Sequence, residues 1–327
     1  MNKHAITTLI ACGLIALPGK AQVTGAGATF PELLYTKWAQ EYKASGGAAI
    51  NYQGIGSGGG IKAITARTVD FGASDSPMSP AELQKAPGIL HIPMCVGAVA
   101  VAYNVPGAPN GLKLTGEIIA DIYLHRINTW NDAKIAALNP GAKLPNLRIV
   151  TVSRADGSGT TAIFTNYLCK VSSSFNTQVS EGKAVNWPRP GVAGKGSPGV
   201  AALIKQTPGA IGYVEQAFAE QSKISFALVQ NAKGNFIKPS LQSASEAAMS
   251  ARLPSDFRAM ITNTADAEGY PIAGFTWILI YPDTKPDVKK FLKWCLTTGQ
   301  KSAPSHDYAP LPESVRKRAL TTVEKLN

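Results

Sequence analysis

Short apolar runs alternate with amphipathic segments along most of the chain, a pattern typical of α/β proteins with largely parallel sheets. The apolar runs predict strands at 50–53, 69–73, 96–104, 148–153, 210–214 and 276–281. The spacing between them predicts helices at 116–125, 158–168, 197–205, 285–296 and 312–326, and another that begins near Phe30 and carries Leu33, Leu34 and Trp38. Ser79-Pro-Ala-Glu82 has the form of a capping box and predicts a further helix, whereas the polar segment 172–198 is predicted to be a surface excursion.

The first residues have the features of a secretory signal. Lys3 precedes an apolar stretch from Ala5 to Leu17, and small residues lead to a cleavage site after Ala21, so 1–21 is predicted to be a signal peptide. No later segment supplies the roughly 18 consecutive apolar residues of a membrane-spanning helix. The mature chain is therefore expected to be exported and soluble. An alternative is that Leu9-Ile-Ala-Cys12 is a lipoprotein box with a lipid on Cys12, although much of the apolar stretch follows that cysteine.

Composition bounds the size and the partners of the protein. With 327 residues, 45% of them hydrophobic, the chain can fill the cores of two domains. Without Lys3 and Lys20 the 32 basic residues fall to 30 against 21 acidic residues, a net charge of +9 that favours acidic partners. The longest basic run is Arg316-Lys-Arg318, with no aromatic residues interleaved, so no nucleic-acid binding is predicted.

The cysteines and histidines form no recognisable site in the sequence. The mature cysteines are odd in number and have no Cys-x-x-Cys spacing, so at most one disulfide is possible and buried free thiols are favoured. No metal site is predicted, because the histidines are far apart in sequence. The residues concerned are Cys95, Cys169, Cys295, His91, His125 and His306.

Three loops at the ends of strand-like runs combine glycines with a hydroxyl. Thr29 follows Gly25-Ala-Gly-Ala, Ser57 lies within Gly56-Ser-Gly-Gly-Gly60, and Ser158 follows Arg154-Ala-Asp-Gly. Free amides and the helix dipole at such a position favour an anion, and glycine lets the backbone approach it closely. Any one loop taken singly is better explained by ordinary helix capping. Three together, one with Arg154 four residues before its serine, favour a shared site for a small anion.

A nucleotide cofactor is the competing interpretation of these loops. Gly54-x-Gly56-x-x-Gly59 matches the dinucleotide fingerprint, but a lone match is weak evidence. A Walker loop would need Gly-Lys-Ser/Thr, and neither glycine loop supplies it. We therefore predict no cofactor.

Asp75, in the run Val69-Asp-Phe-Gly-Ala-Ser-Asp75, places a carboxylate where an anion is expected. One reading is an Asx turn before Pro77. The other is that an ionised carboxylate only accepts hydrogen bonds and so tolerates an anion that still carries a proton. Phosphate carries one near neutral pH and sulfate does not.

The chain resembles the periplasmic phosphate-binding proteins of phosphate-specific ABC transporters over nearly all of its mature length. The motifs that carry the resemblance are Thr24-Gly-Ala-Gly-Ala-Thr-Phe-Pro31, Asn51-Tyr-Gln-Gly-Ile-Gly-Ser57, Val69-Asp-Phe-Gly-Ala-Ser-Asp75, Asp121-Ile-Tyr-Leu124, Arg154-Ala-Asp-Gly-Ser-Gly-Thr160, Pro208-Gly-Ala-Ile-Gly-Tyr-Val-Glu215 and Asp307-Tyr-Ala-Pro-Leu-Pro312. It implies an α/β fold of the two-lobed periplasmic-binding-protein type (type II), with two discontinuous α/β domains joined by two hinge crossings. Lobe I is expected at 22–97 plus 267–327 and lobe II at 98–266. The residues themselves favour crossings in the apolar run that ends at Val105 and before Tyr270.

The resemblance also implies a ligand set. Amides and one hydroxyl would come from the first loop, a hydroxyl from the second, and further donors from the third. Arg154 would be the single cation, held by Asp156, and Asp75 would accept the proton of phosphate. The full set is Ala28, Thr29, Phe30, Ser57, Asp75, Arg154, Ser158, Gly159 and Thr160, with Asp156 in support. Gly58 stands where the family commonly has a second serine.

The implied function is high-affinity, non-catalytic binding of inorganic phosphate in the periplasm by a monomer. The expected partners are the permease and ATPase subunits of an ABC transporter, with no cofactor and no metal. One alternative is a secreted phosphatase with Ser57 or Ser158 as nucleophile, which would need a general base that the sequence does not supply. Another is the same fold with sulfate or a different oxyanion as ligand.

Overall fold

The computed structural model of the protein describes residues 22–189 and 191–326. The predicted signal peptide at 1–21, including Cys12 with its alternative lipid anchor, lies outside the described residues. Within the described ranges, no helix is long and apolar enough to cross a membrane.

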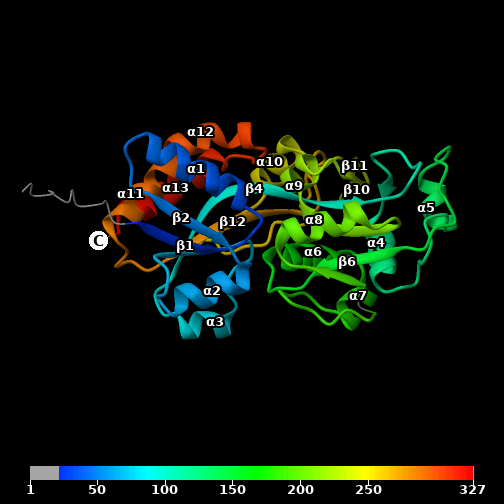
Figure 1. Cartoon of the computed structure of the whole chain (residues 1–327), viewed down its shortest axis with the longest axis horizontal. Helices are drawn as coiled ribbons and strands as arrows, with labels where there is room; N and C mark the ends of the chain where they lie inside the picture. Colours follow the sequence, from blue (N-terminus) through cyan, green and yellow to red (C-terminus); the bar gives the residue numbers. More distant parts are fainter. Residues whose placement is uncertain (1–21, 190, 327) are drawn as a thin grey trace, which may run out of the picture.

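A mixed sheet forms the centre of the molecule (Figure 1). Among the described residues it has nine strands, in the order β2-β1-β3-β12-β4-β8-β6-β7, with β9 paired to β4. They are β1 (Val23–Gly27), β2 (Ile50–Gly54), β3 (Phe71–Ser74), β4 (Leu90–Tyr103), β6 (Val150–Arg154), β7 (Val192–Gly194), β8 (Ala210–Glu215), β9 (Ser225–Phe226) and β12 (Ala273–Ile280). A second, small sheet contains β5 (Lys113–Leu114), β10 (Leu228–Gln230) and β11 (Phe236–Ile237).

The long strand β4 joins the two lobes. Its residues 90–98 pair with β12, and its residues 99–103 pair with β8. We call the half built on the parallel strands β1, β2 and β3 lobe I, and the half built on the parallel strands β6, β7 and β8 lobe II. Nearly all of β4 and all of β8 and β12 are buried, as expected for apolar strands covered on both faces.

Helices cover the sheet in both lobes (Figure 1). In lobe I, α1 packs on β2 and α2 packs on β1 and β3, whereas in lobe II α8 packs on β6 and β8. The α-helices are α1 (Glu32–Ala44), α2 (Ser57–Thr65), α3 (Pro80–Lys85), α4 (Gly116–Tyr123), α5 (Ala133–Leu138), α6 (Gly159–Val171), α7 (Ser173–Gln178), α8 (Gly196–Gln206), α9 (Gln216–Gln221), α10 (Leu241–Met249), α11 (Pro286–Trp294), α12 (Gln300–Ser302) and α13 (Glu313–Glu324). Cys295–Gly299 is a π-helical turn and Ala303–His306 a 3₁₀ turn.

The predicted strands and helices are confirmed, because each overlaps an observed element. The capping box at Ser79 is confirmed too: the Ser79 hydroxyl accepts from the Glu82 amide, and the Glu82 carboxylate accepts from the Ser79 amide. The prediction that 172–198 is a surface excursion is wrong at the C-terminal end of this segment, where β7 pairs with β6. That strand was missed because it has only three residues and ends in glycine.

The strand β1 was also missed, since its sequence Val-Thr-Gly-Ala-Gly reads as a loop. Its glycines serve packing inside the sheet. A Cβ on Gly25 would lie 2.1 Å from Cζ of Phe71, and one on Gly27 would lie 2.1 Å from the Ala73 oxygen. The three cysteines of the described chain are free; Cys95 and Cys295 are buried and Cys169 is partly exposed.

Candidate anion-binding site between the lobes

The predicted anion loops converge because they all follow the carboxyl ends of parallel strands. In lobe I, β1 leads into α1, β2 leads into α2, and β3 ends directly before Asp75. In lobe II, β6 leads through Arg154 into α6, and β7 leads into α8. Ligands of open α/β sheets bind outside these strand ends, and here the ends from the two lobes face each other.

Ser57 makes a direct hydrogen bond between the two lobes. It is fully buried, and its Oγ accepts hydrogen bonds from the Gly159 amide of lobe II at 3.0 Å and the Asp75 amide of lobe I at 3.2 Å. The hydroxyl hydrogen donates to Oδ2 of Asp75 at 3.4 Å. One serine therefore links the predicted loops at Asp75 and Gly159.

Glycine is required where these loops touch. Gly56 has a φ of 81°, and a Cβ there would lie 2.1 Å from Oδ2 of Asp156. Gly58 donates from its amide to the Gly157 oxygen at 2.8 Å, a second direct contact between the lobes. A side chain at Gly56 would hold the lobes apart.

Arg154 is fixed before any ligand arrives. Its Nε and one terminal nitrogen donate to the two oxygens of Asp156 at 2.9 and 2.6 Å, and its other terminal nitrogen lies 3.4 Å from Oγ1 of Thr160. The Arg154 side chain is only 2% exposed. Oδ1 of Asp156 also accepts from the Gly196 amide at the start of α8. The cation is thus neutralised and oriented by Asp156.

The hydroxyls of Ser158 and Thr29 have local partners as well. Ser158 caps α6, accepting from the Thr161 amide at 3.1 Å, and keeps its hydroxyl hydrogen to donate. Oγ1 of Thr29 lies 3.0 Å from Oγ of Ser197 and accepts from the Ser197 amide. The N-termini of α6 and α8 are therefore tied to the same place as the start of α1.

The backbone amides that precede α1 differ in whether they have a hydrogen-bond acceptor. The Ala28 amide donates to the Ala73 oxygen at 3.0 Å, because Ala28 continues the pairing of β1 with β3. The expectation that Ala28 presents a free amide is therefore wrong in this structure. Among the described residues, the Thr29 and Phe30 amides have no hydrogen-bond acceptor, so two donors remain at this end of the cleft.

Asp75 is a charged group whose hydrogen-bonding capacity is only partly filled by its surroundings. It is 1% exposed, and its Oδ1 has no hydrogen-bond partner among the described residues. Burial raises the pKa of Asp75 to about 7, although the Arg154 guanidinium and the hydroxyls of Thr276 and Ser57 oppose the rise. A buried carboxylate oxygen without a donor is costly and is the kind of atom that a ligand proton satisfies.

The structure brings every predicted site residue into this region and adds Gly196 and Ser197. Sequence reasoning assigned Ser197 only to a helix. The signal was nonetheless present, because Gly194-Lys-Gly-Ser197 follows a strand and opens a helix in the same way as the three predicted loops.

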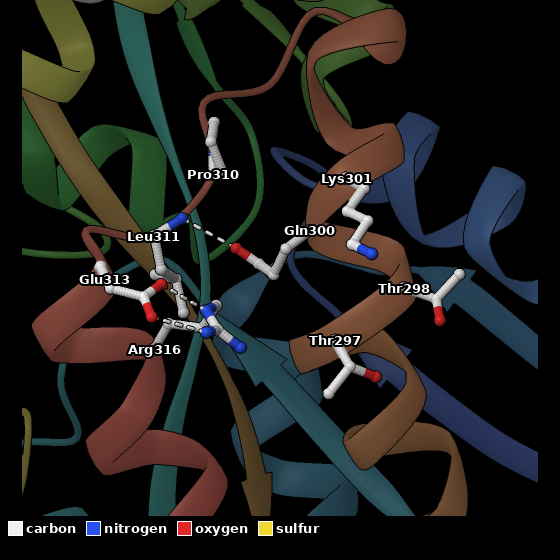
Figure 2. A pocket seen from close by; sticks show the side chains of 8 residues that line it. All are labelled: Thr297, Thr298, Gln300, Lys301, Pro310, Leu311, Glu313 and Arg316. Carbon is white, nitrogen blue, oxygen red and sulfur yellow. Dashed lines mark hydrogen bonds and ion pairs between the residues drawn. The ribbon is translucent and has the colours of Figure 1, made fainter.

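Other cavities lack these features. A pocket of about 550 Å³ lies between the π-helical turn and α13, lined by Thr297, Thr298, Gln300, Lys301, Pro310, Leu311, Glu313 and Arg316 (Figure 2). Its Arg316 already pairs with both oxygens of Glu313, as the dashed lines in Figure 2 show, and with the Leu296 oxygen. Nor do the described residues contain a group of three or more His, Cys, Asp or Glu that could hold a metal ion.

Comparison with known proteins identifies the family. Residues 16–298 match the model of the PBP superfamily domain. Phosphate-binding protein PstS of Xylella fastidiosa (strain Temecula1) is 44% identical over 305 residues, which cover 91% of this chain and 83% of that protein. PstS of Pasteurella multocida is 43% identical over 324 residues, covering 96% and 94% of the two chains.

Solved structures share the fold at lower identity. A high affinity periplasmic phosphate-binding protein (PfluDING) bound with phosphate superposes with a TM-score of 0.72 at 24% identity, over 91% of this chain and 92% of its own. An ABC-type phosphate transport receptor from Vibrio cholerae gives a TM-score of 0.58 at 17% identity, over 89% and 100%. The two-lobed α/β architecture and the extent of these matches agree, and the chain belongs to the PBP superfamily, within the family of PstS phosphate-binding proteins.

Proposed function

We propose that this protein binds inorganic phosphate between its lobes and delivers it to an ABC transporter. The observation that carries the proposal is Asp75, a buried carboxylate between the lobes, one oxygen of which has no hydrogen-bond partner among the described residues. An anion that also offers a proton satisfies both kinds of group at once, and phosphate is such an anion.

The remaining groups suit the other oxygens of phosphate. Gly159 lines the site from lobe II, where its amide already donates to Oγ of Ser57. The donors are the Thr29 and Phe30 amides, the hydroxyls of Thr29, Ser57, Ser158 and Thr160, the Thr160 amide, and the Arg154 guanidinium. Ala28 lines the same turn without donating its amide. Because Asp156 already balances Arg154, binding rests mainly on neutral donors and helix N-termini, which interact strongly with an anion in a site closed to water.

The transport role rests on the relatives named PstS and on the receptor from Vibrio cholerae that shares the fold. With it we propose that the chain is exported to the periplasm after cleavage of 1–21, acts as a monomer and docks on permease and ATPase subunits. The lobe boundaries proposed are 22–97 plus 267–327 for lobe I and 98–266 for lobe II. They place one crossing within β4, near the change of its pairing partner at residues 98 and 99.

The proposed function excludes catalysis. Ser158 caps α6, and the acidic group near Ser57 is Asp75, whose hydrogen bonds hold the loop. Among the described residues, neither serine hydroxyl is hydrogen-bonded to a histidine or a lysine that could activate it as a nucleophile. Incubation with a chromogenic phosphate ester should therefore give no turnover. Turnover that disappears in Ser57→Ala or Ser158→Ala would support a phosphatase instead.

Calorimetry on the mature chain, freed of bound phosphate, tests the binding itself. We expect one phosphate per chain, with affinity weakened by about 10- to 100-fold in Ser57→Ala, because a buried hydrogen bond to an anion is lost. Ser305→Ala, an exposed serine that bonds to the Ser302 oxygen, serves as control. Absence of any phosphate binding to the wild type would overturn the proposed function.

A further inference from the structure

One ion pair spans the two lobes. Nζ of Lys183, in the segment between α7 and β7 of lobe II, lies 2.8 Å from Oε2 of Glu82, in α3 of lobe I. Among the ion pairs of the described residues, it is the only one that joins the lobes. Figure 1 shows α3 and α7 on the same side of the molecule, one in each lobe.

Both partners are held in place by the chain around them. Glu82 belongs to the capping box of α3, where its Oε2 also accepts from the Ser79 amide at 2.7 Å. The segment of Lys183 is anchored to α6, because the Gly182 amide donates to Oγ1 of Thr165 at 3.1 Å. Because the Glu82 carboxylate and the backbone of Lys183 are already anchored, mainly the Lys183 side chain loses conformational freedom when the two pair.

The same segment touches the candidate phosphate loop. The backbone oxygen of Lys183 accepts from the Ser158 amide at 2.8 Å, while Glu82 lies seven residues after Asp75 in the chain. The ion pair therefore connects the lobe I and lobe II halves of the site by short, rigid routes. Lys183 also lines a cavity of about 340 Å³, which is bounded from lobe I by Ser76, Pro77, Ser79 and Pro80, and from lobe II by Ala162, 181–183 and Met260.

The pair is shielded from water when the lobes are closed. The side chains of Lys183 and Glu82 are 18% and 27% exposed. Burial alone would raise the pKa of Glu82, but hydrogen bonds from Lys183 and from the Ser79 amide outweigh it and lower that pKa. Opening the lobes separates the two groups into water, so their attraction stabilises only the closed arrangement.

We propose that Glu82 and Lys183 form an interlobe latch that slows the release of phosphate by holding the lobes closed. The latch rests on the proposed function, since it acts on the same ligand. It determines the dissociation rate rather than the association rate, because the pair forms after phosphate has entered and the lobes have closed. The two residues touch no ligand and act by positioning the lobes.

Substitutions that remove charge without disturbing the fold test the latch. Glu82→Gln keeps the capping box, because glutamine accepts from the same amide, and Lys183→Met keeps the apolar stem and the backbone contact to Ser158. Each should raise the release rate of radiolabelled phosphate by about 3- to 10-fold at unchanged association rate. The double variant should release no faster than either single one, and Lys183→Arg should stay near the wild type.

Glu313→Gln is the matched control, because Glu313 pairs with Arg316 within α13 and should leave release unchanged. Release at the wild-type rate in both single variants, or effects that multiply in the double variant, would overturn the latch. A wild type that binds no phosphate would instead overturn the proposed function and the latch together, so the two failures are distinguishable.

Discussion

Gly159 shows how closely the two halves of the site approach. A Cβ on this residue would lie 2.6 Å from Oγ of Ser57, 2.7 Å from Cβ of Asp75 and 2.8 Å from the Asp75 amide nitrogen. The Asp75 nitrogen belongs to the backbone and the Asp75 Cβ is bonded to it, so these two atoms cannot move unless the backbone moves with them. Gly58, by contrast, would place a Cβ 3.2 Å from Cα of Gly157, a contact that a small shift relieves.

Replacement of each glycine by alanine should separate the two cases. Gly159→Ala should weaken phosphate binding by about 10- to 100-fold, because overpacking of 1 to 3 kcal/mol opposes closure. Gly58→Ala should stay within about threefold of the wild type, because a small shift relieves its contact with Gly157. Calorimetry measures both, and thermal unfolding of the ligand-free proteins should change little, since the clash disappears when the lobes part. Equal affinities for the two variants would contradict this account.

The starts of α1, α6 and α8 act as one unit. Asp156 connects the loop before α6 to the start of α8, and Thr29 at the start of α1 contacts Ser197 in the first turn of α8. The hydroxyl of Thr29 has two tasks, because it accepts from the Ser197 amide and donates to phosphate in the proposed complex. Among the described residues, the hydroxyl of Ser197 is hydrogen-bonded only to Thr29.

Two variants distinguish a ligand donor from a positioning residue at these helix starts. Thr29→Val should weaken phosphate binding by about 10-fold or more, because it removes a donor and leaves the Ser197 amide unpaired. Ser197→Ala should weaken it by less than about threefold, since the backbone contact to Thr29 survives. Calorimetric affinities check both values. A larger loss in Ser197→Ala than in Thr29→Val would show that Ser197 itself contacts the ligand.

The elements most readily predicted from sequence were those with strong periodicity or distinctive caps. The apolar run of β4 and the capping box of α3 are recognisable locally, and the glycine and hydroxyl loops indicated an anion site before any geometry was known. What sequence could not supply depended on contacts between distant residues. The glycines of β1 are explained only by Phe71 and Ala73, and the loss of the Ala28 amide to β3 follows from strand pairing.

In this structure the two lobes of the molecule are closed against each other. Gly58 bonds to Gly157 and Ser57 to Gly159 across the lobes, and Asp75 is buried between them. Burial raises the pKa of Asp75 to about 7 in this arrangement, against an ordinary value near 3.8 for a hydrated carboxyl. Between these pH values the closed form binds more protons than an open form with a hydrated Asp75 does, so closure without ligand takes up a proton.

The ligand-free protein should therefore close more readily in acid. Protonation of Asp75 favours closure fully below about pH 4, and the advantage is lost as the pH rises through about 7. Small-angle X-ray scattering of ligand-free protein should show a radius of gyration that increases from pH 5 to pH 8. Asp75→Asn should show a much smaller change over that range. A wild-type radius independent of pH would contradict the assignment of Asp75 as the group that titrates on closure.

The measurement that tests the central claim most directly is a calorimetric comparison of phosphate and sulfate, with the wild type and with Asp75→Asn. Above about pH 7, where Asp75 is ionised, its carboxylate can only accept hydrogen bonds. It therefore pairs with protonated phosphate, whereas with sulfate two acceptors would face each other. The wild type should prefer phosphate by on the order of 10⁴-fold, and the preference should shrink sharply in Asp75→Asn, whose amide can donate to sulfate. A wild type that binds sulfate as tightly as phosphate would contradict the account.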